Sequence, residues 1–144
     1  MSLKIWLENR WVVEHETSPA EVADLLEVVD RDLADAAIDG LSADWRLGIA
    51  YNAALQLATL ALAAAGYRPG RERAIQSLRY TIALDQATVD TLDGIRRKRN
   101  VGNYERAGTA SSGEAAEVYT IAVTLRQQVI EWLVERYPRL LRSR

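Results

Sequence analysis

The sequence predicts an all-α protein, an antiparallel bundle of about five helices. Apolar residues recur at spacings of three and four along most of the chain, and helix-capping residues punctuate it. No alternating strand pattern persists beyond the first 17 residues. Because 144 residues is the size of one ordinary domain, we expect a single helical domain over 1–144, with the bundle at 18–136.

The first 17 residues admit two interpretations, an N-terminal arm or a short helix. Leu3, Trp6, Leu7 and Trp11 have the spacing of a helix, whereas Trp11-Val12-Val13 suits an extended arm. Either way the two tryptophans need cover, because a chain rarely exposes several large apolar groups together. They cover the bundle's own core or that of a second subunit.

The first bundle helix is expected to begin after Ser18, since Ser18, Pro19 and Glu21 combine a cap, a first-turn proline and a capping-box glutamate. Gly40 is a natural stop. The predicted apolar stripe is Val22, Leu25, Leu26, Val29, Leu33, Ala36 and Ala37. The carboxylates between these positions, Asp32 among them, are predicted to lie on the solvent face.

A second helix is expected from Ser42 to Ala65, with Gly66 as its C-terminal cap. Its apolar segment 49–65 is interrupted by polar residues and is shorter than the ~20 residues that span a bilayer, so we expect the central buried helix and no membrane contact. Asn52, within it, needs a hydrogen-bond partner. The partner is either structural, from the backbone or near Tyr51, or a polar group of the candidate site described below.

A turn is predicted at Tyr67-Arg68-Pro69-Gly70, followed by a third helix from about Arg71 to Leu84. Asp85 caps a fourth helix. The apolar face of that helix is Val89, Leu92 and Ile95. Arg99 follows Leu92 by seven residues and continues this face, whereas Arg97 and Lys98 turn away from it.

A fifth helix follows the linker at 109–113, because Ser111 and Glu114 repeat the capping-box pattern. It is expected to end near Tyr137-Pro138. Its predicted buried face is Ala115, Val118, Tyr119, Ala122, Val129, Ile130 and Leu133.

Composition and motifs exclude several function classes. The chain has no cysteine, which removes disulfides and thiolate zinc sites and is compatible with a cytoplasmic location. Its first ten residues do not resemble a secretory signal. It has no phosphate-binding loop and no Gly-x-Ser-x-Gly elbow, and its one histidine, His15, is expected at the surface. We therefore expect neither a metal nor a cofactor.

One polar run is arranged for chemistry. Four consecutive cations, Arg96 to Arg99, end the fourth helix and are followed by Gly102 and Tyr104. The net charge of −2 gives the whole protein no electrostatic reason to bind nucleic acid, so any such binding must be local. Cations also stabilise a helix end by about 0.3–1 kcal/mol each without any ligand. A non-catalytic helical interaction module is therefore one alternative.

The order of these residues, Arg97-Lys98-Arg99-Asn100 and then Tyr104, resembles the signature of HEPN-domain proteins, as do Ala50-Tyr51-Asn52-Ala53 and the segment 62–69. The similarity covers roughly residues 18–133. It implies a helical bundle in which Arg99 is the motif arginine, Asn100 its polar neighbour, and Tyr104 stands where the family has histidine. In active members, two subunits join their motifs across a homodimer interface and cut RNA without metal.

The tyrosine departs from the family pattern. Because an unperturbed tyrosine titrates near about pH 10, it is a poor general base at neutral pH, although it can donate a hydrogen bond to phosphate or stack on a base. The leading hypothesis is therefore RNA or nucleotide binding by a dimeric site. Its expected residues are Arg99, Asn100 and Tyr104, with the flanking cations Arg96, Arg97, Lys98 and Arg106. The enzymatic alternative is a metal-independent endoribonuclease toxin of a toxin–antitoxin or defence system, restrained by a nucleotidyltransferase-type partner.

Overall fold

The computed structural model describes residues 2–70, 73–102 and 110–141, and for residues 98–102 it describes the helical backbone. Its elements in chain order are α1 (Leu3–Glu8), β1 (Val12–Glu14), α2 (Pro19–Ala36), α3 (Ala43–Ala64), β2 (Tyr67–Pro69), α4 (Ala74–Thr81), α5 (Gln86–Gly102), α6 (Ser112–Arg136) and a 3-10 turn, η1 (Pro138–Leu141). The all-α bundle predicted from the sequence is confirmed, with one two-stranded sheet added to it.

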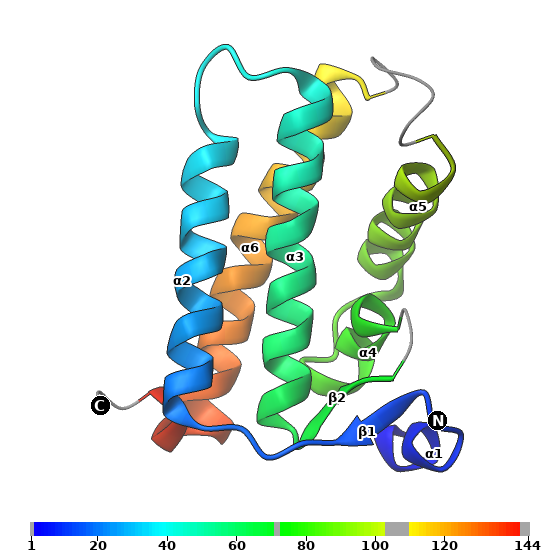
Figure 1. Ribbon diagram of the computed structural model, residues 1–144, viewed down its shortest axis with the longest axis vertical. Helices are drawn as coiled ribbons and strands as arrows, with labels where there is room; N and C mark the ends of the chain where they lie inside the picture. The colour runs from blue at the N-terminus through cyan, green and yellow to red at the C-terminus, as the bar shows by residue number, and fades with distance from the viewer. Residues whose placement is uncertain (1, 71–72, 103–109, 142–144) are drawn as a thin grey trace.

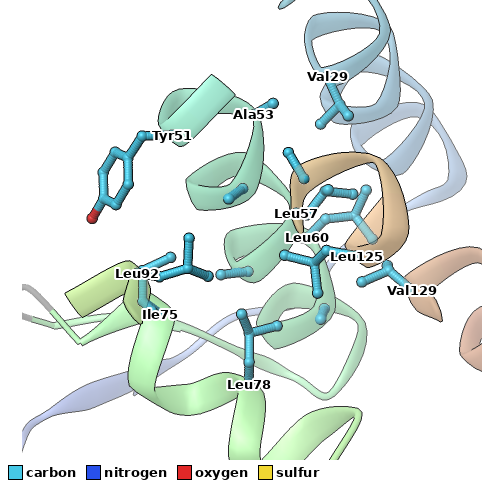
Figure 2. Packing of buried hydrophobic residues seen from close by; sticks show 14 of the residues in the cluster. Val29, Tyr51, Ala53, Leu57, Leu60, Ile75, Leu78, Leu92, Leu125 and Val129 are labelled. Carbon is cyan, nitrogen blue, oxygen red and sulfur yellow. The ribbon is translucent and has the colours of Figure 1, made fainter. Parts of the chain in front are cut away.

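The bundle is built around α3. Figure 1 shows α2 on one side of α3, α4 and α5 on the other, and α6 behind, with α2, α3, α5 and α6 running alternately up and down. The buried apolar side chains of these five helices form one core, of which Figure 2 shows the centre around Leu57, Leu60 and Leu125. The length and hydropathy of α3 would fit a membrane span, but 67% of its most apolar window is buried, as in the core helix of a bundle.

Local capping chemistry fixes the helix starts where the sequence places them. The hydroxyls of Ser18, Ser42 and Ser111 each accept a hydrogen bond from the backbone N–H three residues later. Each bond satisfies one of the N–H groups that a helix start leaves unpaired, and is worth about 0.5–2 kcal/mol. The helix α4 is shorter than predicted, because the chain leaves it after Thr81 and passes through a left-handed residue, Ala83, with φ of 58°.

The segment Tyr67–Pro69 forms a strand, so the prediction of a simple turn there was wrong. It pairs antiparallel with β1, with Val12 opposite Pro69 and Glu14 opposite Tyr67. The N-terminal segment contains both elements that had been alternatives, the helix α1 and then the strand β1. A pairing between segments so far apart leaves no local pattern in a sequence, which explains the miss.

These N-terminal elements make a second, small core against the end of α3. Trp6, Val12 and Leu62 are buried there, and Trp11 and Tyr80 pack edge-to-face against Trp6. Trp6 of α1 is thus buried by its own chain, and Trp11, which precedes β1, is partly buried beside it. Figure 1 places this core at the end of the bundle opposite the α2–α3 loop.

The carboxylate of Asp32 is buried, with a residue exposure of 6%, so its predicted place on the solvent face was wrong. It lies at the α2–α3 contact and accepts a 2.7 Å hydrogen bond from the side-chain amide of Asn52. Asp32 sits at the margin of the apolar stripe of α2, next in sequence to Leu33, where helical periodicity alone does not decide exposure.

Candidate functional site

The fourth bundle helix, α5, positions the candidate residues. Its start is fixed by Asp85, whose carboxylate accepts hydrogen bonds from the backbone N–H and the hydroxyl of Thr88 at 2.9 Å. These bonds, the backbone one foremost, hold the pKa of Asp85 below its usual value. Val89, Leu92 and Ile95 are buried as predicted, with exposures of 2%, 0% and 5%. This line of apolar residues sets the rotation of α5 about its own axis.

The first two cations of the run share one carboxylate. Asp93 accepts a 3.0 Å hydrogen bond from Arg96 and lies 3.8 Å from the guanidinium of Arg97. The side chain of Arg96 is 24% exposed and that of Arg97 is 68% exposed, so Arg97 turns outward as predicted. Sequence analysis missed Asp93, although its spacing of three and four residues before the two arginines is a recognisable signal.

Two of the three expected catalytic residues lie at the far end of this helix. Because α5 continues to Gly102, Arg99 and Asn100 belong to its last turn, with Arg99 four residues beyond the buried Ile95. The side chains of Lys98, Arg99 and Asn100 are outside the described residues, as are Tyr104 and Arg106 altogether. The helical backbone therefore sets the position of Arg99 on the core-facing line of α5.

Two described side chains of α3 lie toward α5 or reach the start of α6. Tyr51 of α3 is 3% exposed, and Figure 2 shows its ring on the Leu92 side of α3, away from Val29. Asp44, in the first turn of α3, accepts a 3.0 Å hydrogen bond from the backbone N–H of Ala110, just before α6. Ala110 is thus fixed to the start of α3. No sequence signal marks a bond that joins residues so far apart.

The side chain of Asn52 makes its hydrogen bond away from the end of α5. Its amide reaches Asp32 on α2, whereas α5 lies on the opposite side of α3. The hydrogen bond that a buried amide requires is therefore supplied across the α2–α3 contact. A role for Asn52 in orienting the end of α5 has no geometric support in the described side chains.

No group of three or more histidine, aspartate or glutamate side chains that could hold a metal ion occurs among the residues the structure describes. His15 is half-buried and its Nε2 lies 2.7 Å from Glu21 Oε1, which also accepts a 2.6 Å hydrogen bond from Thr17. These bonds, that of Thr17 first and that of His15 next, hold the pKa of Glu21 below its usual value. The cluster fastens the link that follows β1 to the first turn of α2.

An open groove of about 450 Å³ runs between the first half of α5 and the first half of α6. Its walls are mostly small or hydroxyl-bearing side chains, and Glu117 is the one charged residue among those that line it. Its lining residues are Ala87, Thr88, Thr91, Gly113, Ala116, Glu117, Thr120 and Ile121. This groove lacks the cations that a phosphate site requires.

Comparison with known proteins does not assign the chain to a family. No family model, curated protein or solved structure matches it. The end of α5 and the residues around it are therefore the basis for inferring a function.

Proposed function

We propose that this protein is a HEPN-like helical bundle whose α5 end binds the phosphate of RNA or of a nucleotide, acting as a homodimer. The binding residues in this proposal are Arg99, Asn100 and Tyr104, with Arg96, Arg97, Lys98 and Arg106 adding positive potential around them. A bidentate arginine beside a tyrosine hydroxyl suits a phosphate, since both groups donate hydrogen bonds to its oxygens.

The observation that carries the proposal is the course of α5. The helix extends through Arg99 and Asn100, and its buried line of Leu92 and Ile95 leads to the position of Arg99. By helical spacing, the position of Arg99 is on the line of Leu92 and Ile95 and not on the outer face that carries Arg97. An antiparallel helical bundle is also the fold that the resemblance to HEPN-domain proteins implies.

Binding is proposed ahead of cleavage, because the motif has tyrosine in place of histidine. Tyrosine can hold a phosphate or stack on a base, at about 1–3 kcal/mol per stacked base, without having to accept a proton. The proposal thus requires the end of α5 to recognise RNA and leaves the strand intact.

Fluorescence anisotropy with a labelled single-stranded RNA, at fixed salt, tests the proposal. We expect Arg99→Ala to weaken binding about tenfold or more, since it removes a charge-assisted phosphate contact of at least ~1.4 kcal/mol. Arg136→Ala is the matched control: it removes one exposed cation from the last turn of α6, at the opposite end of the bundle, and should bind as wild type does.

Equal affinities for all three proteins, or no binding by the wild type, would sink the proposal. The same samples, run on a denaturing gel, report the integrity of the RNA. Cleavage that Tyr104→Phe abolishes would favour the ribonuclease toxin instead, and growth arrest on expression of the wild type, relieved by that variant, would be its cellular counterpart.

A further inference from the structure

The indole of Trp45, in the first turn of α3, is 66% exposed, the most exposed large apolar side chain among the described residues. It lies at the α2–α3 corner, and Ile38 in the same corner is 55% exposed. The corner is held in place, because the guanidinium of Arg46 donates hydrogen bonds to the backbone carbonyls of Ala36 and Ile38. Exposed tryptophan on a rigid element is typical of the centre of a protein interface.

Trp45 heads a whole face of α3 that no other helix covers fully. The residues on that face follow Trp45 at helical spacing and are each half-buried: Gly48, Ile49, Asn52, Leu55, Gln56 and Thr59. A side chain built at Gly48 would meet nothing within 4 Å, so the helix surface is open at that point. In Figure 1, α6 covers the back of α3, and α2 and α5 flank its front.

The two flanks of this face carry opposite charge. The exposed charged side chains of α2 that have no pairing with α6 are three carboxylates and one arginine, Asp24, Glu27, Asp35 and Arg31, whereas the exposed Asp30 pairs with Arg126 of α6. Asp39, just beyond α2 in the same corner, is also exposed. In the sequence of α5, four cations, Arg96 to Arg99, follow Asp93, and the carboxylate of Asp93 contacts the first two of them. Both the acidic end of α2 and the basic end of α5 lie at the same end of the bundle (Figure 1).

From this arrangement we infer that the Trp45 face of α3 binds a second copy of the chain about a two-fold axis parallel to α3. Such an axis sets α2 of each copy against α5 of the other, acidic end to basic end, with Trp45 between them. An axis across α3 would instead bring acidic α2 against acidic α2. A two-fold interface has to complement itself, and the parallel axis satisfies that condition.

The inference specifies an interface for the homodimer that the proposed function includes, with one Arg99 site on each copy and no site shared across the interface, and it does not depend on RNA binding. In this dimer Arg97, which is exposed on the outer side of α5, pairs with the α2 carboxylates of the second copy. Arg99, on the core-facing line of α5, stays with the phosphate site. The two α5 ends then open toward the same end of the dimer.

Light scattering coupled to gel filtration, at micromolar protein, tests the interface. The wild type should elute with the mass of two chains, and Trp45→Ala should raise the dissociation constant about tenfold or more, as loss of a central interface tryptophan does. Val134→Ala is the matched control, because Val134 is 58% exposed on α6, away from this face, and it should leave the mass unchanged. Circular dichroism verifies that each variant is folded.

Charge-reversal variants test the orientation of the two copies in the dimer. Asp39→Lys and Arg97→Glu should each weaken the dimer, and an equimolar mixture of the two variants should form heterodimers as tight as the wild type. A monomeric wild type, or a dimer that Trp45→Ala and both charge variants leave intact, overturns the inference. A dimer that Arg99→Ala alone dissociates would place the interface at the motif instead. Loss of RNA binding in an intact dimer would count against the proposed function only.

Discussion

The side-chain amide of Asn52 on α3 donates a 2.7 Å hydrogen bond to the buried carboxylate of Asp32 on α2. Arg31, the neighbour of Asp32, lies 3.4 Å from the other carboxylate oxygen. The two central helices are therefore joined by a polar contact within an otherwise apolar packing. A buried carboxylate is tolerated only while such donors remain in place.

We expect Asn52→Ala to lower the free energy of unfolding by about 1–3 kcal/mol, because it leaves the Asp32 carboxylate buried without its amide donor. Urea denaturation measures the loss. Asn52→Ala combined with Asp32→Ala should cost less than the sum of the two single changes, since the pair acts as a unit. Strict additivity would show that the bond contributes nothing.

The same Asn52→Ala variant should bind RNA as the wild type does, once both are folded. The amide of Asn52 reaches α2 and not the end of α5, so its loss leaves the phosphate site unchanged. A weakened RNA affinity in the anisotropy assay, with the fold intact, would show that Asn52 contributes to the phosphate site.

Gly70→Ala should destabilise the β1–β2 pair. A Cβ at this position would lie 2.7 Å from the carbonyl oxygen of Arg10, and a backbone atom cannot move aside as a side chain can. Tryptophan fluorescence should report the change, because Trp6 and Trp11 pack next to the sheet. Gly94→Ala is the contrasting control: its Cβ meets nothing within 4 Å and it lies inside α5, so it should stabilise by about 0.5–1 kcal/mol.

Stability should fall in acid partly through Glu21. Its pKa is lower in the folded chain than in the unfolded one, because the hydroxyl of Thr17 and then the ring of His15 hydrogen-bond to it. The stabilisation is therefore complete above the ordinary glutamate pKa and is lost as the pH falls through the lowered value.

Thr17→Val removes the larger of these two causes and should raise the pKa of Glu21 toward that of a free glutamate, as carboxyl NMR titration would show. Glu27→Gln, an exposed change on the same helix, should leave the titration of Glu21 where it is. A Glu21 pKa that is insensitive to Thr17→Val would contradict the assigned cause.

Asp44→Ala should loosen the start of α6. Its carboxylate accepts the backbone N–H of Ala110, and without that bond the amide exchanges with solvent more rapidly. Hydrogen exchange at Ala110 measures the effect, and amides in the middle of α6 should keep their protection. Unchanged exchange at Ala110 would mean that other contacts hold this junction.

Local chemistry accounts for what the sequence could predict. Ser18 and Ser111 mark their helix starts because a cap acts within three residues, and Leu92 and Ile95 are buried because helical spacing repeats within one element. Contacts between distant segments could not be predicted from the sequence. These are the pairing of Val12 with Pro69 and the hydrogen bond from Asn52 to the buried Asp32. At the candidate site the sequence placed Arg99 on the inner line of α5 and overlooked Asp93, which partly neutralises the run.

The β1–β2 pair also orders events during synthesis of the chain. Val12 has no strand partner until Pro69 has been made, and the small core around Trp6 stays incomplete until Tyr80 has followed. The pairing of α2 with α3, in contrast, needs only neighbouring segments. A nascent chain would therefore carry two uncovered tryptophans beside a forming helical pair.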